Sequence, residues 1–396
     1  MQILMSVLGL IGLIGLAFLL SENKKKIKWR TIGTALAMQF LLAYLLVTSA
    51  GQQAMKWLSD GYTKISSYAT DGIMFVFGGF FNEHTTFVFA INVLMVIVFF
   101  GALFAVLFYL NVIQFFVKYV GGALSKLLGT TRVETFSAVM NIFASQNEVP
   151  TFIKPYLKHL TKAELFAVMV AGTGSMAGSI LIGYSLMGIP LEWLLVACFM
   201  VTGSSLLVAK LIVPETEESQ TNGKIELDRK QGSANIFEAI SNGAMSGMQI
   251  ACATATMLIA FVALIALVNG ILGNFGVSLE QLLGYLFYPL AFLMNVSHDQ
   301  VMTASQLLGQ KFATNEFIAY SAMAKEMSQM DTRTIAMLTI GIGGFANFSS
   351  IGILLGSIGV LVPEKRGIVA KYGLRAIVAG LLANLISATI VGIWLL

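Results

Sequence analysis

The sequence predicts an all-α polytopic membrane protein with eight transmembrane helices, two re-entrant hairpins and an inverted repeat. The first observation is composition: 57% of the 396 residues are hydrophobic and 11% are charged, against about 25% charged residues in soluble domains. The second is a series of long uncharged runs. The third is a polar hairpin followed by a glycine-rich span, a combination that occurs twice. This composition largely excludes a soluble enzyme, a nucleic-acid binder and a disordered chain.

Uncharged runs mark the predicted transmembrane helices, since a helix needs about 20 mostly apolar residues to cross a bilayer. The third run has 33 residues, which implies tilt or a bend near Gly101. The sixth helix is expected within the sixth run. The eight runs are residues 1–21, 31–55, 85–117, 165–191, 193–209, 239–279, 334–363 and 376–396.

Basic residues predict the orientation of these helices. A signal peptide carries its positive charges before its apolar run, whereas here a basic cluster at 24–30 follows the first run. We therefore expect a retained first helix with its N-terminus outside. With eight spans, 19 of the 24 Lys and Arg residues fall on the inner side, so both termini are predicted outside. The charged run 214–233 is predicted to be a solvated cytoplasmic loop.

Two further segments are apolar enough for a membrane but are interrupted by polar residues. Residues 133–160 contain Ser-Gln-Asn-Glu at 145–148, and residues 281–320 contain Asn-Glu at 315–316. Pro150 follows the first polar run and lacks an amide donor, so the freed backbone groups need partners inside the protein or in a wet cavity. Each segment is therefore predicted to form a re-entrant hairpin with a polar tip.

Each hairpin is followed by a span with small and polar residues near its centre. These interruptions lie at 171–179 and at 341–350. Glycine and serine taken alone also serve close helix packing. The hairpin and broken span occur twice with two spans between them, so the copies can face opposite ways. That arrangement is typical of secondary transporters with inverted repeats, in which broken helices offer carbonyls to a cation and amides to a substrate.

Three motifs together resemble the concentrative nucleoside transporter family, and specifically its bacterial sodium-coupled members. The first hairpin of that family carries Gly-Gln-Thr/Ser-Glu, where this chain has Ser-Gln-Asn-Glu at 145–148. The second carries Asn-Glu-Phe-Val-Ala, where this chain has Asn-Glu-Phe-Ile-Ala at 315–319. The seventh span carries Phe-Ala-Asn-Phe/Leu-Ser-Ser, which residues 345–350 match fully. The resemblance extends over nearly the whole chain.

The resemblance implies a transporter that imports nucleosides by cation symport, with sodium as the coupling ion and no enzymatic activity or cofactor. It implies three interfacial helices, a homotrimer, and a transport domain that slides like an elevator against a scaffold. The expected location is the plasma membrane of a bacterium, with lipid, nucleoside and sodium as partners and no nucleic acid.

The chain is then expected to divide into six parts. They are the N-terminal helices, an interfacial helix and a scaffold helix at 1–132; the first hairpin with the fourth and fifth spans at 133–213; a cytoplasmic loop and interfacial helix at 214–238; the sixth, scaffold span at 239–280; the second hairpin and seventh span at 281–363; and the eighth span at 364–396.

The resemblance also implies a substrate site, carried over position by position. A ribose offers vicinal hydroxyl donors that an ionised carboxylate accepts, and an amide pairs with the mixed edge of a nucleobase. A carboxylate at a helix end can be a paired structural charge, but intramembrane carboxylates are costly and usually functional. The implied residues are Ser145, Gln146, Asn147, Glu148 and Ile180 for the base, and Glu316, Phe345, Asn347 and Ser350 for the ribose.

The implied cation site consists of the side chains of Asn141 and Ser175 and the backbone carbonyls of Ala144 and Met176. Sodium is a hard cation that suits neutral oxygen ligands. Proton-driven relatives tend to replace this Asn and Ser, so their presence favours sodium, and proton coupling is the alternative.

Two departures from the family pattern bear on specificity. Asn147 replaces the usual Thr or Ser, and Ser-His-Asp-Gln at 297–300 replaces Pro-Trp-Asn-Glu. His298 and Asp299 are either a proton-handling pair or a solvent-facing turn. Ser145 stands where broad-specificity relatives have Gly, and its bulk at the tip predicts a preference for pyrimidine nucleosides such as uridine.

Other function classes fit the sequence less well. An intramembrane serine hydrolase would need a His at the depth of Ser175, and His84 and His159 are expected near span ends. The Gly-rich run at 341–344 lies in an apolar span without a preceding strand, which excludes a dinucleotide site. An ion channel stays open as an alternative. Cys198 and Cys252 lie in apolar runs and are expected to be buried apolar residues.

Overall fold

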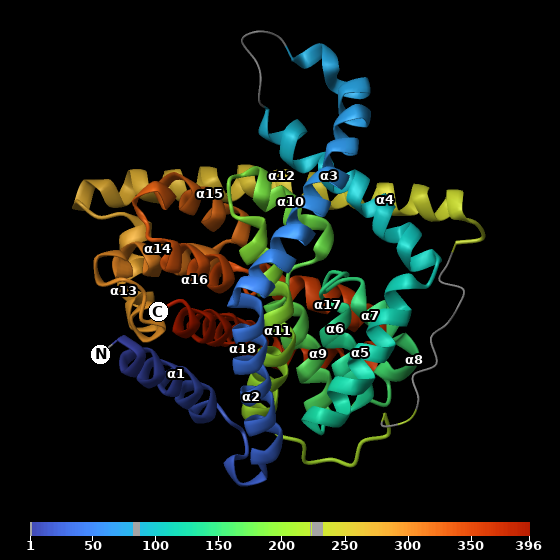
Figure 1. The fold of residues 1–396 in the computed structure, drawn as a ribbon, viewed down its shortest axis with the longest axis vertical. Helices are drawn as coiled ribbons and strands as arrows, with labels where there is room; N and C mark the ends of the chain where they lie inside the picture. The colour runs from blue at the N-terminus through green and yellow to red at the C-terminus, as the bar shows by residue number, and fades with distance from the viewer. Residues whose placement is uncertain (1, 82–87, 222, 224–232) are drawn as a thin grey trace.

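The computed structural model describes residues 2–81, 88–221, 223 and 233–396. These residues are mostly α-helical and contain no strand (Figure 1). In chain order the α-helices are α1 (Gln2–Leu19), α2 (Trp29–Val47), α3 (Ser49–Phe77), α4 (Val96–Tyr109), α5 (Val112–Leu128), α6 (Arg132–Met140), α7 (Val149–Phe152), α8 (Lys154–Leu157), α9 (Lys162–Gly174), α10 (Gly178–Leu186), α11 (Leu191–Ile212), α12 (Ile236–Leu272), α13 (Leu279–Met294), α14 (Val301–Ala313), α15 (Glu316–Glu326), α16 (Thr332–Ile342), α17 (Ser349–Leu361) and α18 (Arg366–Trp394).

The eight predicted spans are all present as helices. Seven helical segments of the described chain are long and apolar enough to cross a membrane, and they include the fourth span with its break between α9 and α10. The seventh span is divided into α16 and α17, which have 11 and 13 residues and are each too short to cross alone. The prediction of an all-α polytopic membrane protein is therefore confirmed.

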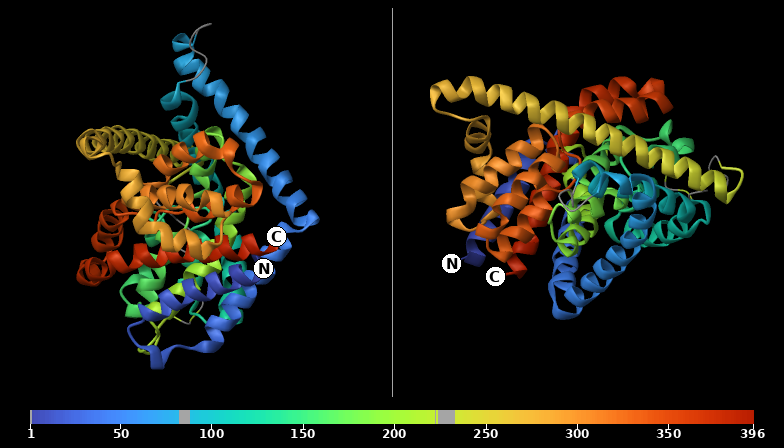
Figure 2. Two further views of the ribbon diagram at one scale, coloured as in Figure 1. Left: turned by 90° about the vertical axis from the view of Figure 1, so that its left-hand side faces the viewer. Right: turned by 90° about the horizontal axis from the view of Figure 1, so that it is seen from above.

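Helix α3 was not among the predicted spans. The second span ends at Val47, eight residues before its predicted end, because the chain turns at Thr48 and its hydroxyl caps the new helix by accepting from the amide of Gly51 at 3.3 Å. Helix α3 is amphipathic, and it projects beyond the rest of the bundle (Figure 2). Both α3 and α5 are candidates for the interfacial helix expected within residues 1–132.

The third span differs from its prediction in where it bends. A π-helical turn at Ala90–Leu94 leads into α4, which ends at Tyr109, and Asn111 then adopts a left-handed conformation with φ of 59°. The run at 85–117 is therefore one span followed by the start of α5. Gly101 is not a bend: a Cβ there would lie 2.5 Å from the carbonyl oxygen of Gly243, so this glycine allows α4 and α12 to pack closely.

The second hairpin is shorter than the predicted segment. Helix α13 is a separate element, and the hairpin consists of α14 and α15, with Thr314 and Asn315 at its tip. His298 and Asp299 are exposed at the turn between α13 and α14. This position is at the other end of α14 from the tip, which agrees with a surface turn and not with a proton-handling pair in the site.

The first part of the charged loop is solvated only in part: Thr216, Glu217, Glu218 and Gln220 are exposed, as predicted, but their neighbours are not. Glu215 accepts from the hydroxyl of Thr161 at 2.8 Å and lies 3.7 Å from Lys210. Ser219 and Thr221 donate to the buried Glu164. Glu215, Ser219 and Thr221 are therefore held against the neighbouring helices, because buried carboxylates there need donors. The predicted charges at 224–230 lie outside the described residues, as does His84.

Three remaining expectations concern single residues and the chain ends. Cys198 is buried, but Cys252 is exposed, because α12 packs against the protein along one narrow stripe only. His159 is exposed just after α8. The two ends of the chain lie close together in all three views (Figures 1 and 2).

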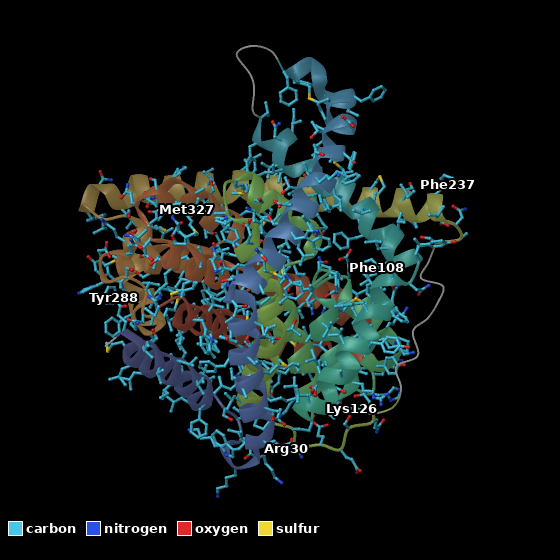
Figure 3. All side chains as sticks on the ribbon, in the orientation of Figure 1. Arg30, Phe108, Lys126, Phe237, Tyr288 and Met327 are labelled. Atoms are coloured by element: carbon cyan, nitrogen blue, oxygen red, sulfur yellow. The ribbon has the colours of Figure 1, made fainter. Side chains whose placement is uncertain are left out.

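The breaks of the fourth and seventh spans contact each other inside the bundle. The amide of Phe345 donates to the carbonyl of Ser175 at 3.2 Å. Gly344 has φ of 84°, and a Cβ there would lie 2.1 Å from the carbonyl oxygen of Gly174, so only glycine fits. Side chains fill the space around these helices, and Phe108 on α4 and Tyr288 on α13 lie on opposite sides of them (Figure 3). The crossing brings the interrupted backbones and both hairpin tips together.

Candidate functional site

Glu316 is a buried carboxylate at the tip of the second hairpin. Glu316 is the first residue of α15. Asn315 caps this helix, because its side-chain oxygen accepts from the amide of Ile318 at 3.0 Å. Glu316 is 4% exposed. It accepts from the hydroxyl of Tyr184 on α10 at 2.9 Å and from the amide nitrogen of Asn347 at 3.3 Å. The second hairpin therefore contacts the broken fourth span through one side of this carboxylate and the broken seventh span through the other.

Gln146 makes the equivalent contact from the first hairpin. Its Nε2 donates to the hydroxyl of Ser350 at 2.9 Å, and Ser350 in turn donates to the carbonyl of Phe345. The Oε1 of Gln146 is buried without a hydrogen-bond partner in the described chain. This side chain thus keeps one acceptor available for a ligand at the point where the first hairpin contacts the seventh span.

Asn347 joins the two hairpin tips into one network. Its Oδ1 accepts from the hydroxyl of Ser349 at 2.6 Å and from the amide of Ser350 at 3.3 Å. Its Nδ2 donates to Glu316. Hydrogen bonds therefore run from Gln146 through Ser350 and Asn347 to Glu316, as the predicted grouping of these residues requires.

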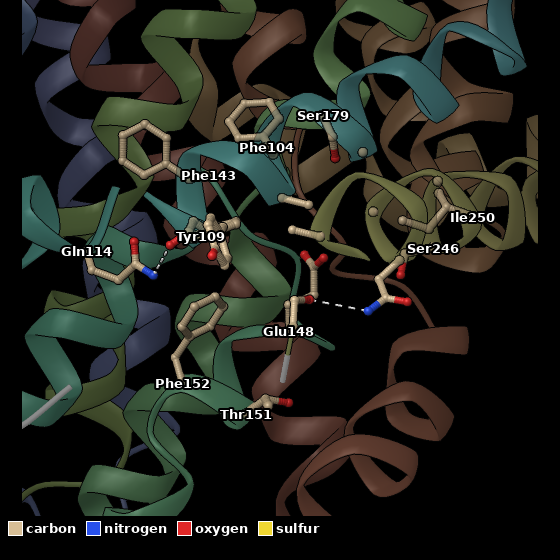
Figure 4. Close-up of a pocket in the computed structure, with 18 of the residues that line it drawn as sticks. Phe104, Tyr109, Gln114, Phe143, Glu148, Thr151, Phe152, Ser179, Ser246 and Ile250 are labelled. Atoms are coloured by element: carbon tan, nitrogen blue, oxygen red, sulfur yellow. Dashed lines mark hydrogen bonds between the residues drawn. The ribbon is translucent and has the colours of Figure 1, made fainter. Parts of the chain in front are cut away.

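A cavity of about 880 Å³ adjoins the first hairpin (Figure 4). Its volume is in the range of small-molecule sites, and its wall is mostly apolar and aromatic, as such sites are. Glu148 and Ser179 line it, together with residues of α4 and the first third of α12. Ile180, the predicted neighbour of the base, follows Ser179 and is buried. Of the residues predicted for the base, Glu148 lines the cavity, whereas Ser145, Gln146, Asn147 and Ile180 do not, and neither does Glu316.

The first tip holds its carboxylate differently from the second. Glu148 accepts from the amide and the hydroxyl of Ser145 at 2.7 and 2.9 Å. Asn147 and Glu148 are both exposed, whereas Ser145 is buried with its hydroxyl directed at Glu148. The predicted base-facing residues thus combine an open carboxylate, an exposed amide and a serine that already has a partner.

The residues predicted for the cation also lie at helix ends. Asn141 is the C-cap residue of α6 and Ser175 is the C-cap residue of α9, and the C-terminus of a helix carries negative partial charge. The Oδ1 of Asn141 is buried and has no hydrogen-bond partner among the described residues, while its Nδ2 donates to Ser137 at 2.8 Å. Ser175 donates to Gly172 at 3.3 Å, which leaves its lone pairs free. Buried Ala144 and Met176 stand beside them, so neutral oxygens suited to a hard cation are available.

Three residues of this region were missed from the sequence. Tyr184 donates to Glu316, Asn384 on α18 donates to the carbonyl of Gly174 at 2.8 Å, and Tyr62 on α3 donates to the carbonyl of Gly178 at 2.8 Å. For Tyr184 and Asn384 the available signal was a polar group inside an apolar run, whereas Tyr62 lies in a polar stretch and gave no signal. That signal does not identify the partner, because each partner is distant in sequence.

The chain matches three family models along its length. The model described as "Na+ dependent nucleoside transporter C-terminus" matches residues 193–392, and the corresponding N-terminus model matches residues 8–80. A third model, described as "Nucleoside recognition", matches residues 90–191. Together these models include both hairpins and both broken spans.

Relatives of similar length match the whole chain. An uncharacterized transporter YutK of Bacillus subtilis is 44% identical over 100% of both chains. The nucleoside permease NupC of Helicobacter pylori is 39% identical, covering 99% of this chain and 98% of the relative. Human solute carrier family 28 member 3 is 34% identical over 99% of this chain and 60% of its own length.

Solved structures of CNTnw have the same fold. The structure titled as an inward-facing substrate-bound state is 41% identical, covers 100% of this chain and 98% of the other, and has a TM-score of 0.94. A variant titled as the intermediate 2 state has a TM-score of 0.95 at 40% identity, covering 100% and 99%. The chain therefore belongs to the family of sodium-dependent nucleoside transporters, which are membrane carriers and not enzymes.

Proposed function

We propose that this protein imports nucleosides by sodium symport and binds them between the two hairpin tips. The observation that carries this proposal is the continuous network from Gln146 to the buried Glu316. Glu316, Asn347 and Ser350 bind the ribose hydroxyls, and Phe345 lines the sugar. An ionised carboxylate accepts two vicinal hydroxyls at once, and such charge-assisted bonds are stronger than neutral ones.

The base occupies the side of the site that faces the cavity. Gln146, Asn147 and Glu148 present amide and carboxylate groups to the edge of the base, and Ile180 packs beside it. Ser145 favours pyrimidines over purines because it fills space at the tip where a second ring would lie. Uridine is the expected substrate.

Sodium binds to Asn141, Ser175 and the carbonyls of Ala144 and Met176. The orphaned Oδ1 of Asn141 supports this assignment, since a buried acceptor without a partner is costly unless a ligand satisfies it. Proton symport is the alternative, and it would need a titrating group in place of these neutral oxygens.

Transport proceeds by an elevator movement of the hairpins and broken spans against α4 and α12. The fixed packing of α4 on α12 through Gly101, Gly243 and Gly247 supports a rigid scaffold. Beyond its first third, α12 is an exposed apolar helix, which supports a homotrimer with α12 at its interface and lipid around it. The exposed apolar residues are Ile259, Val262, Leu264, Leu267 and Ile271. We place the protein in a bacterial plasma membrane with both termini outside.

Uptake into proteoliposomes tests the proposal. Labelled uridine should accumulate under an imposed inward sodium gradient and should not accumulate under a proton gradient alone. Unlabelled cytidine should compete and adenosine should compete more weakly. Accumulation driven equally by protons would replace sodium symport with proton symport, and no accumulation of any nucleoside would refute the proposed function.

A further inference from the structure

Lys311 is a buried lysine that the proposed binding reaction does not use. It lies near the C-terminus of α14, and its side chain is 0% exposed. Its Nζ has no hydrogen-bond partner within the described chain. None of the ion pairs between described residues includes it. Because a buried ammonium without a counter-charge is costly in a membrane protein, its position needs a physical explanation.

Glu316 is the buried carboxylate that lies across the tip of the second hairpin from Lys311. Lys311 is in the last turn of α14, which ends at Ala313, and Glu316 is the first residue of α15, so the two buried groups flank the same tip. The other titratable groups that interact with Glu316 are the hydroxyls of Tyr184 and Tyr320, and near these lies the thiol of Cys198. These groups are uncharged at neutral pH, so Lys311 is the group among them that can balance a negative charge on Glu316.

The two charges are arranged as neighbours without a direct ion pair. Tyr184 and Asn347 already donate to the carboxylate oxygens of Glu316. An ammonium in direct contact would compete with these donors and with the hydroxyls of a sugar. When its ammonium group does not contact Glu316 directly, Lys311 can still favour the ionised carboxylate through the low-dielectric interior. Both carboxylate oxygens of Glu316 then stay accessible to other donors.

We propose that Lys311 is the internal counter-charge that keeps Glu316 ionised within the closed hairpin tip, so that the carboxylate can accept ribose hydroxyls. The inference rests on the proposed function, in which Glu316 binds the sugar. A protonated Glu316 would carry one hydroxyl donor and would lose its charge-assisted acceptor bonds. Lys311 is thus a positioning residue that acts through Glu316 and does not contact the substrate.

Substitution Lys311→Met tests the proposal because it keeps an unbranched apolar chain and removes the charge. The uridine affinities of the purified wild-type protein and of the variant are compared from about pH 6 to about pH 9. The variant should bind about tenfold more weakly at neutral pH, and the loss should shrink as pH rises, because Glu316 then ionises without help. An unchanged affinity, or a loss that does not depend on pH, would overturn the proposal.

Two comparisons separate the charge effect from a structural one. Lys325→Met, at an exposed position on α15, should bind uridine as the wild type does. In the Glu316→Gln background, Lys311→Met should cause little further loss, since a neutral amide needs no counter-charge. If the two losses in binding free energy simply add, Lys311 does not act through Glu316.

Infrared spectroscopy of the ligand-free protein gives a readout that requires no nucleoside. Lys311→Met should gain a band of a protonated carboxyl group, and the band should be absent from the wild type and from the double variant with Glu316→Gln. Absence of this band in Lys311→Met would overturn the proposal even if nucleoside transport is established. Presence of the band would support it even if the substrate proves to be a different molecule.

Discussion

The two hairpin tips each carry a glutamate, but the two glutamates have very different surroundings. The first is a turn of eight residues at 141–148, and its Glu148 is exposed to a cavity of about 880 Å³. The second has two residues between its helices, and its Glu316 is 4% exposed and held by two donors. One tip is therefore accessible in this state while the other is closed.

This difference indicates that the two tips recognise different parts of the substrate. A carboxylate in a closed, low-dielectric site gains more from each donor than one that competes with water. The closed tip is suited to a constant feature of every nucleoside, its ribose. The open tip is suited to the variable base, because an exposed group adapts to different partners at lower cost. The following predictions test this division, beginning with the largest effect.

Replacing the carboxylates should affect the two tips unequally. Glu316→Gln removes a buried charge that accepts hydroxyl donors, and a bond to a charged group contributes about 1.5–3 kcal/mol. Uridine affinity should fall about ten- to hundredfold. Glu148→Gln should cause a smaller loss, of about tenfold or less, and Glu326→Gln at an exposed position on α15 is the control. Equal losses at both tips, measured by calorimetry, would contradict the division.

Asn141→Ala should weaken sodium binding at the first hairpin. The variant loses the buried Oδ1 that has no protein partner, so the sodium concentration for half-maximal uptake should rise about tenfold. Asn274→Ala, on an exposed residue after α12, serves as the matched control. Sodium dependence identical to that of the wild type would exclude Asn141 from the cation site.

Tyr184→Phe should weaken ribose binding without changing the choice of base. It removes one donor to Glu316 and keeps the aromatic packing against Phe317. Affinity for uridine should fall about fivefold, while the ratio of uridine to adenosine affinity should stay constant. A change in the ratio of uridine to adenosine affinity would show that the second hairpin tip also contributes to base selectivity.

Ser145→Gly should give the smallest change, a roughly threefold improvement in competition by adenosine. The effect is small because the serine is already turned toward Glu148. Ser145→Ala removes the hydroxyl and keeps the Cβ, so it separates bulk from hydrogen bonding. If alanine admits adenosine as well as glycine does, the bond to Glu148 sets the preference; if neither does, Asn147 becomes the discriminating residue.

The features that depend on neighbouring residues, namely the spans and the hairpin tips, could be predicted from the sequence. Uncharged runs located the spans, and the polar runs at 145–148 and 315–316 located both tips. Prediction from the sequence failed where the outcome depends on contacts between distant segments: α13 was merged with the second hairpin, and Gly101 was taken for a bend although it packs against α12. Nor does any local pattern show that Tyr184 lies against Glu316, or that one tip is open and the other closed.

Equilibrium binding of labelled uridine to the purified protein, with and without sodium, tests the central claim most directly. We predict saturable binding that strengthens when sodium replaces an inert cation, and we expect Glu316→Gln to weaken binding at every sodium concentration. Uridine binding that is insensitive to sodium, or that is the same in Glu316→Gln as in the wild type, would contradict a nucleoside site built jointly from the two hairpin tips.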